Sequence, residues 1–127
     1  MDLNAWLVKA KENANAKECG MYLIHNGVVR ETSRKEVRQG VITAPVKAIN
    51  FSYNKELLEK IVNETKNDNG IKYVDVYLNE GILNVGDDLM YVLVGGDIRD
   101  NVLNSMNSLL KRIKTECVKE EEILEKE

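Results

Sequence analysis

The chain has 127 residues, of which 43% are hydrophobic and 31% are charged. This composition is typical of a globular protein, so neither a disordered chain nor a membrane protein is favoured. The net charge of -3 argues against general nucleic-acid binding, which needs a basic surface. The length fits one domain with its own core. We therefore expect a single domain over 1–127, with a core over 1–115 and an acidic tail over 116–127.

The sequence also indicates where the protein resides. Its apolar stretches are too short to span a bilayer, and the amino terminus lacks the pattern of a signal peptide. Cys19 and Cys117 lie far apart and form no CxxC pair, which favours reduced thiols over a disulfide or a zinc site. We therefore expect a cytoplasmic protein with no membrane or nucleic-acid partner.

The first third of the chain predicts a helix, a strand and a loop. Apolar residues recur at helical spacing over about 2–17, which indicates an amphipathic helix with Asp2 as its cap. Residues 21–29 are rich in strand-forming types and predict a central strand. Residues 30–45 are charged and weakly periodic, which indicates a mobile loop with a short strand around Val41.

The rest of the chain predicts, in order, a strand over 46–51, a helix over about 54–69, strands over 71–78 and 88–94, and a helix over about 97–114. Turn residues between the last two strands predict an antiparallel pair. Gly95 and Gly96 are expected to end the second strand, and Asp97 to cap the last helix. Because helices and strands do not alternate strictly, the pattern favours an α+β fold with helices on a mostly antiparallel sheet.

No common enzyme motif is present: the sequence has no phosphate-binding GxxxxGK, no GxGxxG, no HExxH and no GxSxG. What remains is a set of basic residues placed near the ends of predicted elements. Arg30 follows the first strand, Arg99 opens the last helix, Lys114 closes it, and Lys119 comes five residues later. Side chains at such positions can converge on an anion.

Each of these residues also has a purely structural interpretation, and spacing alone leaves both open. Arg99 is either an anion-binding residue or a surface arginine, and Lys114 is either functional or a favourable cation at a helix end. His25, the single histidine, is either a structural strand residue or an acid-base group. Cys117 is either incidental or a thiol made reactive by nearby lysines.

Three segments resemble the large, catalytic subunit of molybdopterin synthase. GVVRETS at 27–33 is similar to the Gly-x-Val-Arg that ends that family's first long strand. The run from 74 to 99 resembles two strands joined by a Gly-x-Leu-x-x-Gly-Asp/Glu turn and followed by an arginine that opens the final helix. IKT at 113–115 is similar to the family's Leu-Lys-Thr, so the resemblance spans most of the chain from Gly20 to Lys119.

The resemblance implies a hammerhead-like α/β fold and a homodimer. It also implies a small ubiquitin-like sulfur-carrier subunit as partner, whose Gly-Gly tail enters the active site as a thiocarboxylate. The implied reaction transfers two sulfurs onto cyclic pyranopterin monophosphate, which gives the dithiolene of molybdopterin. No metal and no cofactor is implied for the catalytic subunit.

The resemblance further assigns roles to individual residues. Arg30 and Arg99 match arginines that line the family's substrate and tail pocket, and Lys114 matches its first catalytic lysine. A lysine amine is chemically suited to act as a nucleophile or proton carrier at a thioester-like carbon. Lys119 matches the second catalytic lysine only if the preceding loop is about two residues shorter; without that gap the matching position is Glu121.

The sequence departs from the family pattern at three places. Ile98-Arg99 stands where the family has His-Arg, and Leu78-Asn79 replaces a second His-Arg. The closing Pro-x-Trp-Lys-Lys-Glu is represented by CVKEEE, beginning at Cys117. Two hypotheses follow: a divergent sulfur-transferring enzyme, or a binding or regulatory paralogue that has kept the fold and the dimer but lost sulfur transfer. An unrelated anion-binding domain is a third, and would have a different strand order.

Overall fold

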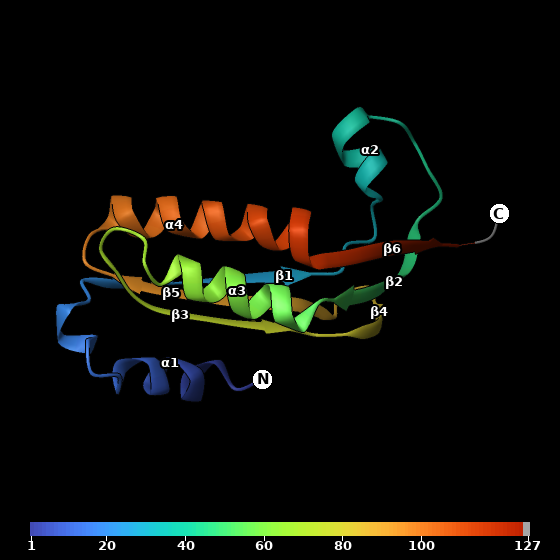
Figure 1. Ribbon diagram of the computed structural model, residues 1–127. Helices are drawn as coiled ribbons and strands as arrows, with labels where there is room; N and C mark the ends of the chain where they lie inside the picture. The colour runs from blue at the N-terminus through green and yellow to red at the C-terminus, as the bar shows by residue number, and fades with distance from the viewer. Residues whose placement is uncertain (126–127) are drawn as a thin grey trace.

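The computed structural model describes residues 1–125 (Figure 1). The helices are α1 (Leu3–Lys11), α2 (Arg34–Gln39), α3 (Lys55–Thr65) and α4 (Arg99–Arg112), with a 3-10 turn η1 (Ala16–Glu18) and a π-helical turn η2 (Ile113–Cys117). The strands are β1 (Met21–Val28), β2 (Val46–Tyr53), β3 (Ile71–Leu78), β4 (Gly81–Asn84), β5 (Asp88–Gly96) and β6 (Val118–Leu124). None of the described helices is long and apolar enough to cross a membrane.

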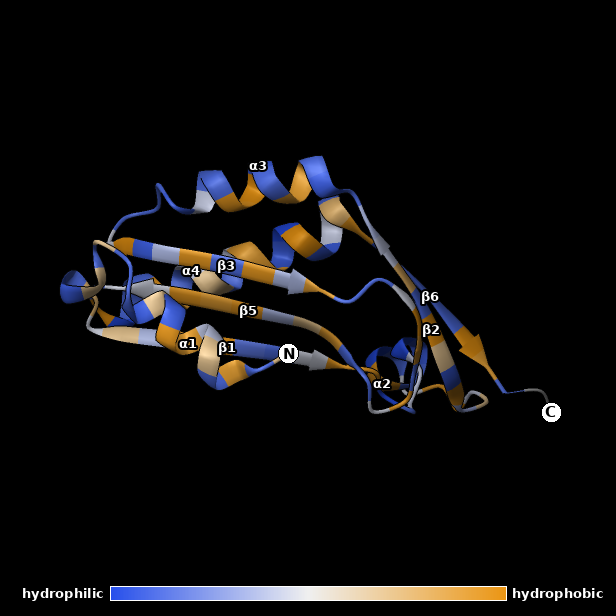
Figure 2. Ribbon diagram, turned by 90° about the horizontal axis from the view of Figure 1, so that it is seen from below, coloured by the Kyte–Doolittle hydropathy of each residue, from blue (hydrophilic) through white to orange (hydrophobic). Residues whose placement is uncertain are grey.

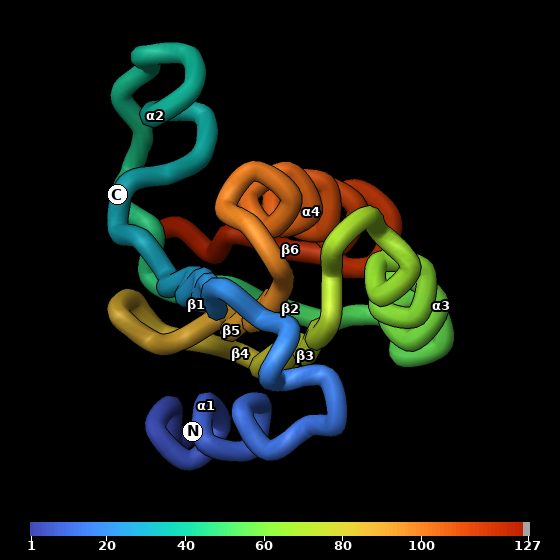
Figure 3. The backbone as a smooth tube through the Cα atoms, turned by 90° about the vertical axis from the view of Figure 1, so that its left-hand side faces the viewer, coloured from blue at the N-terminus to red at the C-terminus, as the bar shows by residue number. Residues whose placement is uncertain are grey.

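The larger part of the molecule is a three-layer sandwich around an antiparallel sheet of order β1-β5-β3. Helices α3 and α4 lie side by side on one face of this sheet, and α1 lies on the opposite face (Figure 3). The apolar bands of β5 run through the middle of these layers (Figure 2). Alternate residues of β5 serve the two faces: Val92 and Val94 join the α3–α4 core, whereas Tyr91 and Leu93 pack with Trp6 of α1.

A second antiparallel sheet, of order β4-β2-β6, lies at one end of the first sheet (Figure 1). Its inner face contributes to the main core, where Phe51 of β2 is fully buried. Helix α2 projects from the body beside this sheet and stands apart from the other helices (Figure 3). The second sheet therefore forms a shoulder between the central sandwich and α2.

Three helices begin at side-chain caps that the sequence supplies. The carboxylate of Asp2 accepts from Ala5 N at 3.1 Å, and the amide oxygen of Asn54 accepts from Leu57 N at 3.1 Å. The Asp2 cap confirms the prediction for the first helix, and the Asn54 cap lies at the predicted start of the helix over about 54–69. The hydroxyl of Ser33 caps α2 in the same way, and Gly40 ends that helix with a left-handed backbone at φ 67°.

The α+β fold class is confirmed, and so is the antiparallel pairing of the strands that begin at Ile71 and Asp88. Four local predictions are wrong. Asp97 does not cap α4: Ile98 occupies the N-cap position with no side-chain cap hydrogen bond, and the Asp97 carboxylate accepts from Ile98 N instead. Residues 30–45 contain α2 and no strand at Val41, and the turn between the paired strands contains β4. Gly95 lies inside β5, where a Cβ atom would approach the ring of Tyr22 to 2.7 Å. Glycine is required there because the neighbouring ring lies against the backbone.

The acidic segment from residue 116 also differs from the prediction. Within its described part, Val118–Leu124 form β6, which pairs along the whole length of β2. A tail was expected because glutamates crowd this segment, and glutamate is depleted in strands. The strand forms because β2 offers an open edge, and because Glu120 and Glu122 find partners on α2.

Candidate functional site

A cleft of about 100 Å³ lies between the end of β1, the second sheet and η2. Six elements (β1, α2, β2, β5, η2 and β6) and the loop after β1 meet there, so residues far apart in the sequence become neighbours. The lining residues are Val28, Arg30, Thr32, Arg34, Ile49, Leu89, Lys114, Glu120 and Glu122. An apolar floor with charged walls is the usual composition of a site for a small polar ligand.

Lys114 reaches the cleft because the chain changes from α-helix to π-helix at the end of α4. The amide of Val118 donates to the carbonyl oxygen of Ile113, which closes the wider turn. Ile113 is fully buried and Cys117 is 5% exposed, so these two side chains fix the turn against the core. Lys114, between them, is exposed and lines the cleft. Single π-helical turns frequently occur at functional sites.

Arg30 is positioned by the segment that follows β1. Val29 is buried, and its amide and carbonyl groups bond to Asp87 and Gly86, each at 2.9 Å. The next residue, Arg30, is exposed at the mouth of the cleft, where its Nε donates to the carbonyl oxygen of Thr32 at 2.9 Å. The remaining guanidinium N–H groups can therefore bind an anion.

The cleft carries charges of both signs. Three cations line it, Arg30, Arg34 and Lys114, together with the carboxylates of Glu120 and Glu122. The two glutamates share one face of β6 because they pair with inward-facing residues of β2. The excess of positive charge suits an anionic ligand, and the mixture suits one with both acidic and hydrogen-bonding groups.

Lys119 does not line this cleft. It pairs with the exposed Ser52 of β2, whereas Glu120 pairs with the buried Phe51, so Lys119 lies on the opposite face of the sheet. Its ammonium group is 3.2 Å from Glu121, and its side chain is 76% exposed. The expectation that Lys119 joins Lys114 in one cleft is therefore not met in this chain.

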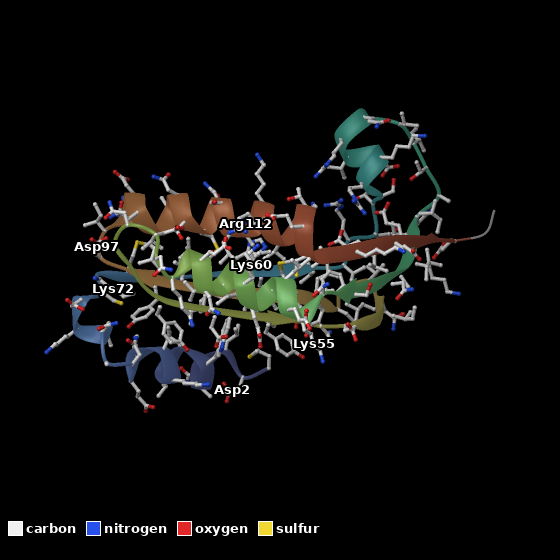
Figure 4. All side chains as sticks on the ribbon, in the orientation of Figure 1. Asp2, Lys55, Lys60, Lys72, Asp97 and Arg112 are labelled. Carbon is white, nitrogen blue, oxygen red and sulfur yellow. The ribbon has the colours of Figure 1, made fainter. Side chains whose placement is uncertain are left out.

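Arg99 lies at the other end of α4 from Lys114. Lys114 comes 15 positions after Arg99 along continuous helix, which is about 20 Å along the axis. Asp97, just before the helix, and Arg112, in its last turn, mark these opposite ends in Figure 4. Within one copy of the chain, the structure thus brings Arg30 and Lys114 together but leaves Arg99 outside.

Two further candidates fall outside the lining of the cleft. His25 is half-buried in β1, and burial lowers its pKa, as expected for a structural histidine. Burial raises the pKa of the Cys117 thiol, which contradicts the idea that nearby lysines make it reactive. Among residues 1–125, no group of three or more His, Cys, Asp or Glu side chains is arranged to hold a metal ion.

Sequence reasoning missed the three other charged residues of the lining: Arg34, Glu120 and Glu122. The signal for the first was present, because Ser33 and Glu36 have the spacing of a capping box and Gly40 closes the same helix. A signal for the glutamates lay in the alternation along 118–124, which places every second side chain on one face. The charged residues of 30–45 favoured a loop there, and the glutamates of 118–124 favoured a tail, so neither element was predicted.

The fold and the cleft together define a small α+β protein whose cleft is lined by three cations and bordered by strand β6. The family model for the MoaE protein matches residues 2–116. A search of curated proteins by sequence gives no match.

Solved structures show the same fold. Molybdopterin synthase from Staphylococcus aureus superposes with a TM-score of 0.70 at 17% identity, covering 87% of this chain and 79% of that one. The MoaE protein from Burkholderia ambifaria gives 0.72 at 21% identity, covering 98% and 83%. The complex of subunits 1 and 2 of molybdopterin-converting factor from Helicobacter pylori gives 0.69 at 19% identity, covering 100% and 82%.

The chain therefore belongs to the MoaE protein family, and its role lies in molybdenum cofactor biosynthesis. The resemblance to the molybdopterin synthase large subunit, drawn from three short segments, is confirmed.

Proposed function

We propose that this chain is the catalytic subunit of a molybdopterin synthase, and that it transfers sulfur from a thiocarboxylated carrier protein to cyclic pyranopterin monophosphate. The observation that carries the proposal is the meeting of Arg30 and Lys114 in one cleft. These are the two residues whose positions match the family's pocket arginine and first catalytic lysine. They come from segments 84 residues apart in the sequence, so their meeting depends on the fold.

The chemistry of the cleft supports distinct roles for the two residues. The guanidinium of Arg30 is suited to hold a phosphate or carboxylate oxygen through paired hydrogen bonds. The amine of Lys114 is suited to act at the acyl carbon of a bound thiocarboxylate, either as a nucleophile or as a proton carrier. Both side chains are exposed, which leaves them open to an incoming peptide terminus and a phosphorylated pterin.

The partner in this proposal is a small ubiquitin-like sulfur-carrier protein. The Helicobacter pylori neighbour is a protein-protein complex of two subunits of molybdopterin-converting factor. The alignment covers 100% of this chain and 82% of the matched chain of that complex. That likeness supports a two-subunit assembly here. A flexible Gly-Gly terminus is also thin enough to enter a cleft of this size, because glycine carries no side chain.

Arg99 enters the site through a second copy of the chain. The resemblance implies both a homodimer and an arginine at this position in the pocket, yet α4 separates Arg99 from Lys114 within one copy. Both expectations hold together if each copy lends its Arg99 to the cleft of the other. A twofold dimer gives two identical composite sites of this kind.

The second candidate function is a binding or regulatory paralogue without sulfur transfer. Lys119 favours it, because this residue pairs with Glu121 away from the cleft and leaves a single lysine there. The carboxylates of Glu120 and Glu122 also favour it, because they lower the positive charge that an anionic substrate would meet.

Reconstitution separates the two functions. The purified protein is mixed with a thiocarboxylated carrier and cyclic pyranopterin monophosphate, and the dithiolene product is quantified against a reaction with an unmodified carrier. Sulfur transfer predicts product that depends on the thiocarboxylate. Tight binding of the carrier with no dithiolene would establish the non-catalytic function instead, and the absence of both binding and product would rule out both.

A further inference from the structure

The cleft contains a cation that the resemblance does not assign. Arg34 lines it together with Arg30 and Lys114, and comes from the first turn of α2. Its Nη2 lies 3.6 Å from a carboxylate oxygen of Glu120, and its backbone N–H donates to Glu122 at 3.0 Å. The side chain and the backbone of Arg34 thus have separate partners on β6.

The position of Arg34 is built into the fold. We refer to residues 31–45, which carry α2, as the arm. The arm is closed at its base by Val46 N donating to the carbonyl oxygen of Glu31 at 2.7 Å, and by the hydroxyls of Ser33 and Thr43 at 2.6 Å. Ser33 is 3% exposed, so this base is also packed. Arg34 follows directly, and its main chain is fixed relative to the cleft.

The contact between Arg34 and Glu120 is weak enough to exchange. The 3.6 Å separation is longer than that of a good charged hydrogen bond, and the Arg34 side chain is 37% exposed. The phosphate of a cyclic monophosphate has two unesterified oxygens, which can accept two parallel hydrogen bonds from the guanidinium, whereas Glu120 makes one long contact with it. Because the bond from the Arg34 backbone to Glu122 does not involve the guanidinium, the side chain can change partner while the arm stays in place.

We propose that Arg34 is a further substrate-binding residue of this cleft: Glu120 holds its guanidinium in the free protein, and the phosphate group of the substrate takes it over on binding. This deepens the proposed function and rests on it, because it names the group that recognises the substrate's phosphate. Glu120 then acts as an internal competitor that keeps Arg34 in the cleft before the substrate arrives.

Binding of inorganic phosphate to the intact protein tests the exchange without any turnover. Calorimetric titrations compare the wild type with Arg34→Gln, Glu120→Gln, the double variant, and Arg38→Gln, a matched control on the exposed side of α2. We expect Arg34→Gln to weaken phosphate binding at least 10-fold and Glu120→Gln to tighten it 3-fold or more. The double variant should bind no more tightly than Arg34→Gln, and the control should stay within twofold of the wild type.

Arg34→Gln and Glu120→Gln break the same ion pair, so opposite signs separate the exchange from a pair that only stabilises the arm. The double variant separates it from a simple change of charge, under which Glu120→Gln would tighten phosphate binding even without Arg34. If the pair only stabilised the arm, both variants would change phosphate binding in the same direction, and that result would overturn the proposal. So would an Arg34→Gln variant that binds phosphate as the wild type does. Arg30→Gln separates failure of this proposal from failure of the proposed function. If Arg30→Gln loses phosphate binding and Arg34→Gln does not, the cleft still binds phosphate and only the role of Arg34 is overturned.

Discussion

Asn54 and Cys117 are joined by two hydrogen bonds. The backbone N–H of Asn54 donates to the backbone carbonyl oxygen of Cys117 at 3.0 Å, and the Cys117 thiol donates to the backbone carbonyl oxygen of Asn54 at 3.5 Å. Asn54 is also the cap of α3. The start of α3 is therefore joined to the end of the π-helical turn that carries Lys114. The position of the lysine depends on this junction as well as on α4.

Removing the thiol should weaken the junction. Cys117→Ala removes a buried sulfur and its hydrogen bond, so we expect the free energy of unfolding to fall by about 1–2 kcal/mol. Urea unfolding followed by circular dichroism measures this change. Cys19→Ala is the control and should stay within about 0.5 kcal/mol of the wild type, because that side chain is only partly buried. Equal losses in the two variants would show that the junction adds nothing.

The two cysteines should differ in reactivity. Cys117 is buried and its pKa is raised by that burial, whereas Cys19 is partly exposed. A thiolate is the reactive form, so a disulfide reagent such as DTNB should label Cys19 in the folded protein and Cys117 only after unfolding. The absorbance of the released aromatic thiol gives the number of cysteines labelled before and after unfolding. Rapid labelling of both thiols in the folded protein would contradict the burial of Cys117.

His25 should make the stability depend on pH. Burial lowers its pKa in the folded protein, so the unfolded chain accepts a proton at a higher pH than the folded chain does. Stability from this residue is complete above about pH 6.5 and is lost as the pH falls below that value. The thermal midpoint should therefore drop more between pH 7.5 and pH 5.5 for the wild type than for His25→Gln. Parallel curves would show that His25 is as free to protonate in the folded state as in the unfolded chain.

A composite active site predicts complementation between two inactive variants. Arg99→Gln and Lys114→Gln each damage every site of their own homodimer. In a mixed population, half the dimers are hybrids, and one of the two sites in each hybrid has both residues intact. Unfolding and refolding the two variants together should restore about one quarter of the wild-type sulfur transfer. Activity that stays at the level of the separate variants would place Arg99 outside the site.

The sequence predicted the central sandwich because its elements have clear periodicity. The strand from Met21 and the pair that begins at Ile71 and Asp88 follow strand-forming composition, and the caps Asp2 and Asn54 mark true helix starts. In each case the local signal agrees with the tertiary environment.

The shoulder and the arm were harder to predict because tertiary contacts determine them. The strand that contains Glu120 and Glu122 exists through its pairing with β2, and no local preference for strand marks it. Arg34 lines the cleft because this strand lies beside α2, and that contact cannot be inferred from the local sequence. The separation of Arg99 from Lys114 needed the straight course of α4, although helix length alone would have indicated it.

Single-turnover sulfur transfer by a Lys114→Gln variant tests the central claim most directly. The rate of dithiolene formation is measured with saturating thiocarboxylated carrier, beside Lys111→Gln, which changes an exposed lysine on the preceding turn. We predict a loss of at least about 100-fold for Lys114→Gln, as for removal of a nucleophile or proton carrier, with carrier affinity and the Lys111→Gln rate within twofold of the wild type. A Lys114→Gln rate equal to that of Lys111→Gln would show that the chemistry takes place somewhere other than this cleft.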